Sequence, residues 1–169
     1  MRIALRLAFD EEAAVRLLNW LAQENALIWS QSAALPLLYD SGVVYQLEQD
    51  ETWTDYLTML TQGWEDCDSL AAARAGELLA LGHRALREGD AGFSEAQRLK
   101  PKAIEAEVYL TTRTKPGVPG LYHCVTRYKL GRRWFSDDPS ARLGMHGGQI
   151  DPIVRRRWAQ PPEPRWRTT

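Results

Sequence analysis

Three residue types that together perform nucleophilic catalysis occur in the order Cys67, His123 and Asp138. A catalytic cysteine attacks as the thiolate, and a helix N-terminus favours this anion because free backbone N–H groups and the positive end of the helix dipole lie there. Cys67 lies in the segment GWEDCDSL, directly before the strongly helical AAARAGELLALG. The sequence therefore predicts a reactive thiol in the first turn of a helix, with Asp66 as the N-cap.

The neighbours of Cys67 affect this prediction in two ways. The carboxylates of Glu65, Asp66 and Asp68 oppose thiolate formation, so a nearby imidazolium must offset their charge. The alternative is a buried structural cysteine, but such a residue usually has apolar neighbours, and these neighbours are polar. The free N–H groups of the same helix end are also suited to stabilise the oxyanion of a tetrahedral intermediate.

His123 is the predicted partner among the 3 histidines of the chain. His83 lies far along the same predicted helix as Cys67, and His146 lies in GMHGG, where nothing orients it. His123 lies in the predicted strand LYHCVTRY, which can hold an imidazole ring rigidly. Because successive side chains of a strand face opposite sides, we expect Cys124 to point away from the site and into the packing.

The third group should orient the imidazole of His123. A hairpin with its two-residue turn at Leu130–Gly131 would place Asp138 opposite His123 on the same face. A register shift of one residue would substitute Asp137. Taken alone, the segment DDPS is typical of a turn. Together with Cys67 and His123 it favours a catalytic triad, with Asp137 as the alternative to Asp138.

Helices precede strands along the chain, which predicts an α+β fold with the helices packed on one side of an antiparallel sheet. Helices are expected at about 11–33, at 53–62 with Thr52 as the N-cap, and at 67–86. The third helix has an apolar stripe, formed by Leu70, Ala73, Leu78, Leu81 and Ala85. Alternating patterns predict strands within 2–9, 103–113, 121–130 and 132–137.

Length and composition indicate a single domain over residues 1–146, followed by an extended basic tail rich in Pro and Arg over 147–169. With a formal net charge of -1, the chain has no overall attraction to nucleic acid or to an anionic membrane. We find neither an apolar run of membrane-spanning length nor a signal peptide, and so expect synthesis in the cytoplasm. The 2 cysteines show no metal-site spacing, which disfavours a zinc site at Cys67 and His123, and no cofactor is expected.

Three segments resemble the motifs of transglutaminase-like cysteine peptidases of the papain-like superfamily, above all the small versions encoded by bacteriophages and prophages. These segments are GWEDCDSLAAARAGEL, YHCVTRY and SDDPSARLGM, and the resemblance spans about residues 51–145. It implies a cysteine-bearing helix packed on an antiparallel sheet that bears the histidine and the aspartate. Cys67 would be the nucleophile, His123 the general base and later acid, and Asp138 the orienting group. Trp53 and Trp64 are candidates for lining the site.

The predicted chemistry is acyl transfer through a thioester, which water resolves in a hydrolase and an amine in a transglutaminase. The expected substrate is a protein or peptide, such as a virion protein, a host protein or the peptide of peptidoglycan. The competing prediction is a non-catalytic virion assembly protein that keeps this fold and acts through surfaces such as its Trp- and Arg-rich tail. Association with the virion is expected in that case and is compatible with the enzyme.

Overall fold

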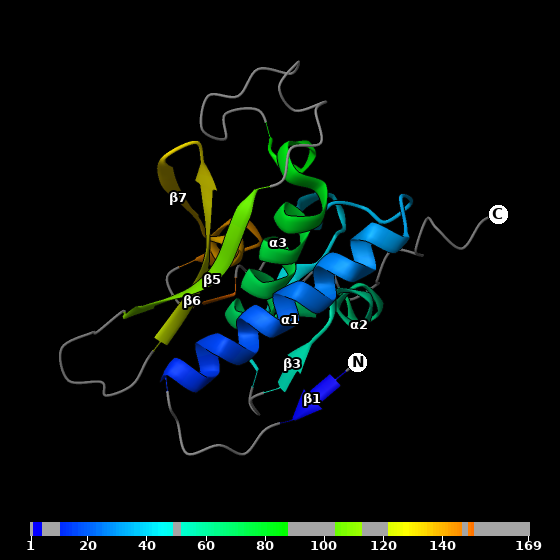
Figure 1. Cartoon of the computed structure of the whole chain (residues 1–169). Helices are drawn as coiled ribbons and strands as arrows, with labels where there is room; N and C mark the ends of the chain where they lie inside the picture. Colours follow the sequence, from blue (N-terminus) through cyan, green and yellow to red (C-terminus); the bar gives the residue numbers. More distant parts are fainter. Residues whose placement is uncertain are drawn as a thin grey trace.

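The computed structural model describes residues 2–4, 11–48, 52–87, 104–112, 122–146 and 149–150, which form a mixed helix and sheet structure (Figure 1). The elements, with 3-10 helices written η, are β1 (Arg2–Ala4), α1 (Glu11–Gln31), η1 (Leu38–Asp40), β2 (Val44–Tyr45), β3 (Thr52–Thr54), α2 (Tyr56–Gln62), β4 (Trp64–Glu65), α3 (Cys67–Leu81), η2 (Gly82–Ala85), β5 (Glu105–Thr112), β6 (Tyr122–Leu130), β7 (Arg133–Asp137), α5 (Pro139–Arg142), β8 (Met145–His146) and β9 (Gln149–Ile150).

Helix α3 is the centre of the molecule, packing against both α1 and the antiparallel sheet β5-β6-β7 (Figure 1). All side chains from Asp68 to Leu78 are buried, so the helix has no solvent-facing side over these residues. Leu70, Ala73 and Leu78 of the predicted stripe are buried, as expected, but the burial of α3 extends beyond that stripe. Its many alanines account for the difference, because small side chains let a helix be covered closely on several sides.

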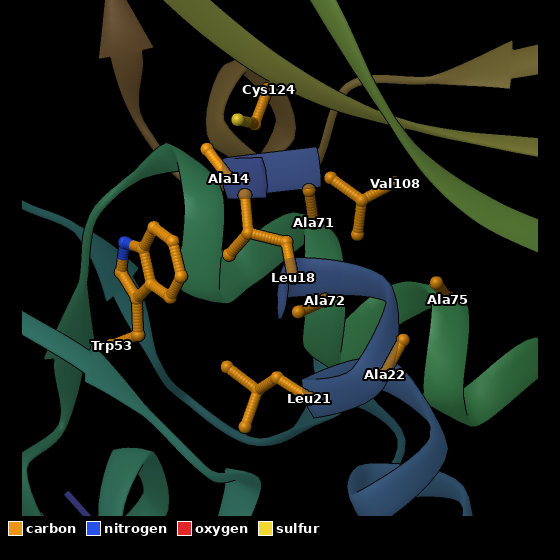
Figure 2. Close-up of a cluster of buried hydrophobic side chains, with 10 residues drawn as sticks. All are labelled: Ala14, Leu18, Leu21, Ala22, Trp53, Ala71, Ala72, Ala75, Val108 and Cys124. Carbon is orange, nitrogen blue, oxygen red and sulfur yellow. The ribbon is translucent and has the colours of Figure 1, made fainter. Parts of the chain in front are cut away.

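The contact between α1 and α3 is made largely by small residues. Ala22 of α1 and Ala71, Ala72 and Ala75 of α3 belong to one buried cluster, which Trp53 and Cys124 complete from β3 and β6 (Figure 2). The two helices lie very close at Gly76, since a Cβ atom there would lie 2.6 Å from the carbonyl oxygen of Ala22. This tight contact fixes the helix that begins at Cys67.

The second predicted helix begins three residues later than predicted, at Tyr56 instead of Trp53. Thr52 to Thr54 form β3, which pairs with β1, and Asp55 is the N-cap of α2. The Asp55 carboxylate accepts a hydrogen bond from the backbone N–H of Thr58 at 2.8 Å. The prediction of Thr52 as the cap is wrong because a better capping residue follows it. The end at Gly63 is as predicted, with a left-handed φ of 80°.

The hairpin β6–β7 turns at Gly131–Arg132, one residue later than predicted, because Leu130 pairs with Arg133. The register is thereby shifted by two residues, and Asp137 lies opposite Thr126. A shift of two residues keeps every side chain on its predicted face. Thr126 lies on the face toward α3, where its hydroxyl donates to the carbonyl of Ala71 at 2.9 Å.

The predicted basic tail contains one described element, β9, which pairs antiparallel with β8. Residues 147–148 and 151–169 lie outside the described residues, as do 5–10 of the predicted first strand. No helix in the described ranges has both the length and the apolar character needed to cross a membrane.

Candidate active site

Cys67 is the first residue of α3, as the sequence predicts. Because an N-terminal N–H of a helix has no acceptor within the helix, the N–H of Cys67 takes no part in the hydrogen bonds inside α3. Asp66 occupies the N-cap position, but its side chain makes no capping hydrogen bond, which corrects its predicted role. Instead, Asp68 accepts a hydrogen bond from the N–H of Ser69 at 2.6 Å.

A buried carboxyl group supports the turn before Cys67. Glu65 accepts hydrogen bonds from the hydroxyl of Thr54, from Nε2 of Gln62 at 2.9 Å and from the N–H of Asp66 at 3.2 Å. Burial, together with the neighbouring Glu48, raises the pKa of Glu65 to about 8. Glu65 is therefore mostly neutral at pH 7, so one of the three carboxyl groups expected to oppose the thiolate does not.

His123 of β6 is buried, with 5% of its surface exposed, and its Nε2 lies 2.9 Å from Oδ2 of Asp138. This hydrogen bond leaves Nδ1 as the ring nitrogen free to face Cys67. Burial lowers the pKa of His123, but hydrogen bonds with Asp138 and Cys67 outweigh it and raise the pKa to about 9. The ring is accordingly held as an imidazolium at neutral pH.

Asp138 makes one contact that fits each of the two interpretations of the segment DDPS. Its Oδ1 accepts a hydrogen bond from the N–H of Ala141 at 3.0 Å and so caps α5, while its Oδ2 bonds His123. Asp137 points elsewhere and forms ion pairs with Nε of Arg74 at 2.9 Å and Nε of Arg142 at 3.1 Å. Asp138 rather than Asp137 is therefore the neighbour of the imidazole.

The ionisation of Cys67 depends on both residues 123 and 124. A hydrogen bond from the Cys124 side chain lowers the pKa of Cys67 most, burial opposes it, and hydrogen bonds from His123 and from the backbone N–H of Cys124 lower the pKa further, to about 5. Between about pH 5 and pH 9 the two side chains thus form a thiolate–imidazolium pair.

Cys124 contradicts the expectation that it points away from the site. It belongs to the buried cluster of Figure 2, as expected for a packing residue, but it also donates to Cys67. The physical reason is that the sulfur of Cys67 meets β6 at the backbone N–H of Cys124. At the backbone it can reach side chains that leave the strand on either side.

Tyr45 is a neighbour of Cys67 that the sequence analysis missed. It lies on β2, whose parallel partner β4 precedes Cys67. Burial raises the pKa of Tyr45 to about 12, and the negative charges of Cys67, Asp66, Asp68 and Asp138 add to the rise. The only sequence signal was the short extended pattern around VVY, which does not reveal its pairing partner.

The aromatic candidates and the other histidines lie as follows. Trp53 is 8% exposed in the core cluster and is a packing residue, whereas Trp64 is half-buried on β4 two residues before Asp66. His83 lies in η2, beyond the far end of α3 from Cys67. The backbone of His146 lies in β8, and its side chain is outside the described part.

Within the described residues, no group of three or more His, Cys, Asp or Glu side chains is arranged to hold a metal ion.

Comparisons with protein-family models, with curated proteins and with solved structures found no match to this chain. The chemistry of the site is therefore inferred from its own residues: an acidic thiol, a basic imidazole and a carboxylate that orients the ring. Such a set activates a sulfur nucleophile and carries a proton to or from the atoms that react with it.

Proposed function

We propose that the protein is a thiol-dependent hydrolase, a cysteine peptidase or amidase that acts through an acyl-thioester. The observation that carries this proposal is Cys67 at the N-terminus of α3, whose pKa is lowered by hydrogen bonds from Cys124 and from His123. The ring of His123 is in turn held by Asp138 at 2.9 Å. An ion pair of this kind supplies a nucleophile at neutral pH without a separate activation step.

The reaction would proceed in two halves. The Cys67 thiolate forms a bond to the carbonyl carbon of an amide, and the imidazolium of His123 gives its proton to the departing amine as the C–N bond breaks. In the second half, neutral His123 takes a proton from water, the resulting hydroxide attacks the thioester, and the thiolate leaves. Asp138 keeps the same ring nitrogen toward Cys67 in both halves.

The packing of a cysteine-bearing helix on an antiparallel sheet that carries the histidine supports a papain-like, transglutaminase-like fold as part of this proposal. The resemblance of the three motifs to phage and prophage enzymes supports a protein or peptide as the substrate, such as a virion protein or the peptide of peptidoglycan. Water is the default acceptor because no described feature selects an amine.

The test uses p-nitrophenyl acetate, a small ester that acylates reactive thiols, with intact-protein mass spectrometry and p-nitrophenol release as readouts. The wild type should form an acetyl adduct at Cys67 and turn over, while Cys67→Ala should do neither. His123→Ala should lower the rate about 10²–10⁴-fold, as expected when a general acid–base group is lost. His83→Ala is the matched histidine control and should leave the rate unchanged.

Two outcomes decide between the competing functions. If the wild type releases p-nitrophenol no faster than Cys67→Ala, the hydrolase proposal is wrong and the non-catalytic assembly role is favoured. If added methylamine captures the acetyl group in preference to water, the enzyme is a transferase of the transglutaminase type.

A further inference from the structure

The short strand β2 connects the two halves of the candidate active site. On one side, the N–H of Val44 donates to the carbonyl of Gly63 at 3.2 Å and the N–H of Gln46 donates to the carbonyl of Glu65 at 2.9 Å, both shortly before Cys67. On the other side, the N–H of Tyr45 donates to the carbonyl of Leu143 at 2.9 Å. Leu143 directly follows α5, the helix that Asp138 caps. The backbone of Tyr45 is thus fixed between the nucleophile and the aspartate.

The side chain of Tyr45 is buried beside the nucleophile. Only 8% of the residue is exposed, and it belongs to a core cluster against which Cys67 packs. The charged groups that act on its hydroxyl are Cys67 first, then Asp66, Asp68 and Asp138. A hydroxyl beside a nucleophile is suited to donate a hydrogen bond to the substrate oxygen whose carbon the nucleophile attacks.

We propose that the Tyr45 hydroxyl is a donor of the oxyanion hole and, with the backbone N–H of Cys67, binds the carbonyl oxygen of the substrate that Cys67 attacks. The inference rests on the proposed function and adds a catalytic residue to it. As the C–S bond forms, the carbonyl π electrons move onto oxygen, and the two hydrogen bonds strengthen with its negative charge. Tyr45 donates a hydrogen bond throughout and transfers no proton.

The ionisation of Tyr45 is compatible with this role. Burial and the neighbouring negative charges raise the pKa of the phenol to about 12, so the hydroxyl keeps its proton across the pH range in which the thiolate–imidazolium pair exists. A fixed hydroxyl in a buried site also needs little reorganisation when the oxyanion forms.

Two reactions of Cys67 separate an oxyanion-hole donor from a residue that only packs or only stabilises the thiolate. Acylation by p-nitrophenyl acetate passes through a tetrahedral oxyanion, whereas alkylation by iodoacetamide is a displacement at a saturated carbon and forms none. Tyr45→Phe removes the hydroxyl and keeps the ring. We expect it to slow acylation about 10²–10³-fold, the usual effect of deleting one oxyanion donor, and to change the alkylation rate less than about threefold.

Tyr109→Phe is the matched control, because Tyr109 lies on β5 with 43% of its surface exposed, and it should change neither rate. An unchanged acylation rate in folded Tyr45→Phe would overturn the proposal. An equal fall in the acylation and alkylation rates would also overturn it, because Tyr45 would then stabilise the thiolate instead of the oxyanion. Either result leaves the hydrolase proposal standing. If the wild type itself acylates no faster than Cys67→Ala, the proposed function fails first, and Tyr45 with it.

Discussion

At the scale of single residues, Asp138 has two separate functions in its two oxygens. One oxygen caps α5 through Ala141, and the other holds the imidazole of His123. The aspartate that opens the turn is therefore also the one that bonds the imidazole. This double use explains why the local pattern DDPS alone could not distinguish the two interpretations.

Asp138→Asn separates the two functions, because an amide oxygen can still cap α5 while the negative charge toward His123 is lost. We expect the His123 pKa to fall from about 9 toward the ordinary value of 6.5. The rate of acylation by p-nitrophenyl acetate should fall about 10³–10⁴-fold, as in other triads that lose this charge. Titration of the His123 ring by NMR measures the first effect, and p-nitrophenol release measures the second.

The sign of the stability effect follows from the raised pKa. The pairing of His123 with Asp138 stabilises the fold fully below the unfolded pKa of 6.5, and this contribution is lost as pH rises through about 9. By urea denaturation, Asp138→Asn should have a lower free energy of unfolding than the wild type at pH 6, and this deficit should disappear by pH 10. Asp138→Ala, which also loses the cap, should keep a deficit of about 1 kcal/mol at pH 10. Equal deficits at both pH values would contradict this account.

The residues of the candidate triad could be predicted because type, order and local context are encoded in the sequence. The roles of Cys124 and Tyr45 could not. Cys124 acts on Cys67 partly through a backbone N–H, which every residue except proline has. Tyr45 is brought to the site because β2 pairs in parallel with β4 over only two residues, and β4 follows α2 in the sequence.

At the scale of elements, the sequence predicted α1, α3 and the three strands of the main sheet, because their periodic patterns are long. It failed at short features. Thr52 was chosen as a cap although Asp55 follows it, and the hairpin turn was placed one residue early. The predicted stripe on α3 leaves out Ala71, Ala72, Ala75 and Gly76, which lie where α1 packs closely.

Gly76→Ala tests the close packing of α1 on α3. The new Cβ would lie 2.6 Å from the backbone oxygen of Ala22 and 2.9 Å from the backbone N of Ala26, so the helices must separate. We expect a loss of about 1–3 kcal/mol in the free energy of unfolding, even though alanine favours helix over glycine by about 1 kcal/mol. Urea denaturation provides the measurement.

Gly131→Asn is the control for this variant, because nothing lies within 4 Å of a Cβ there and asparagine tolerates its φ of +61°. Gly131→Asn should therefore change the free energy of unfolding little. If Gly76→Ala stabilises the protein instead, helix propensity dominates and the contact with α1 is looser than described.

At the scale of the whole molecule, buried contacts join the parts that carry the site. Arg74 of α3 bonds Asp137 at 2.9 Å, which ties the helix of Cys67 to the strand that leads into Asp138. Strand β2 makes a second connection, between Glu65 and Leu143. The mixture of helix and sheet could be predicted from local patterns. The closure of the site could not, because these contacts join segments far apart in the chain.

The most direct test of the account is the pH dependence of Cys67 alkylation by iodoacetamide between pH 3 and pH 10, resolved by peptide mass spectrometry. The midpoint matters more than the rate, since a thiolate of low pKa is also a weaker nucleophile. Cys124 is an internal comparison, because its hydrogen bond with Cys67 and its burial raise its pKa. Circular dichroism identifies the pH range in which the protein is folded.

Cys67 alkylation should reach half of its plateau near pH 5, well below the ordinary cysteine value of 9.0, and His123→Ala should move this midpoint upward. Because His123 holds its proton until about pH 9, the plateau should extend to that pH. A midpoint near pH 9 in the folded wild type, unchanged in His123→Ala, would contradict the thiolate–imidazolium pair on which the proposed function rests.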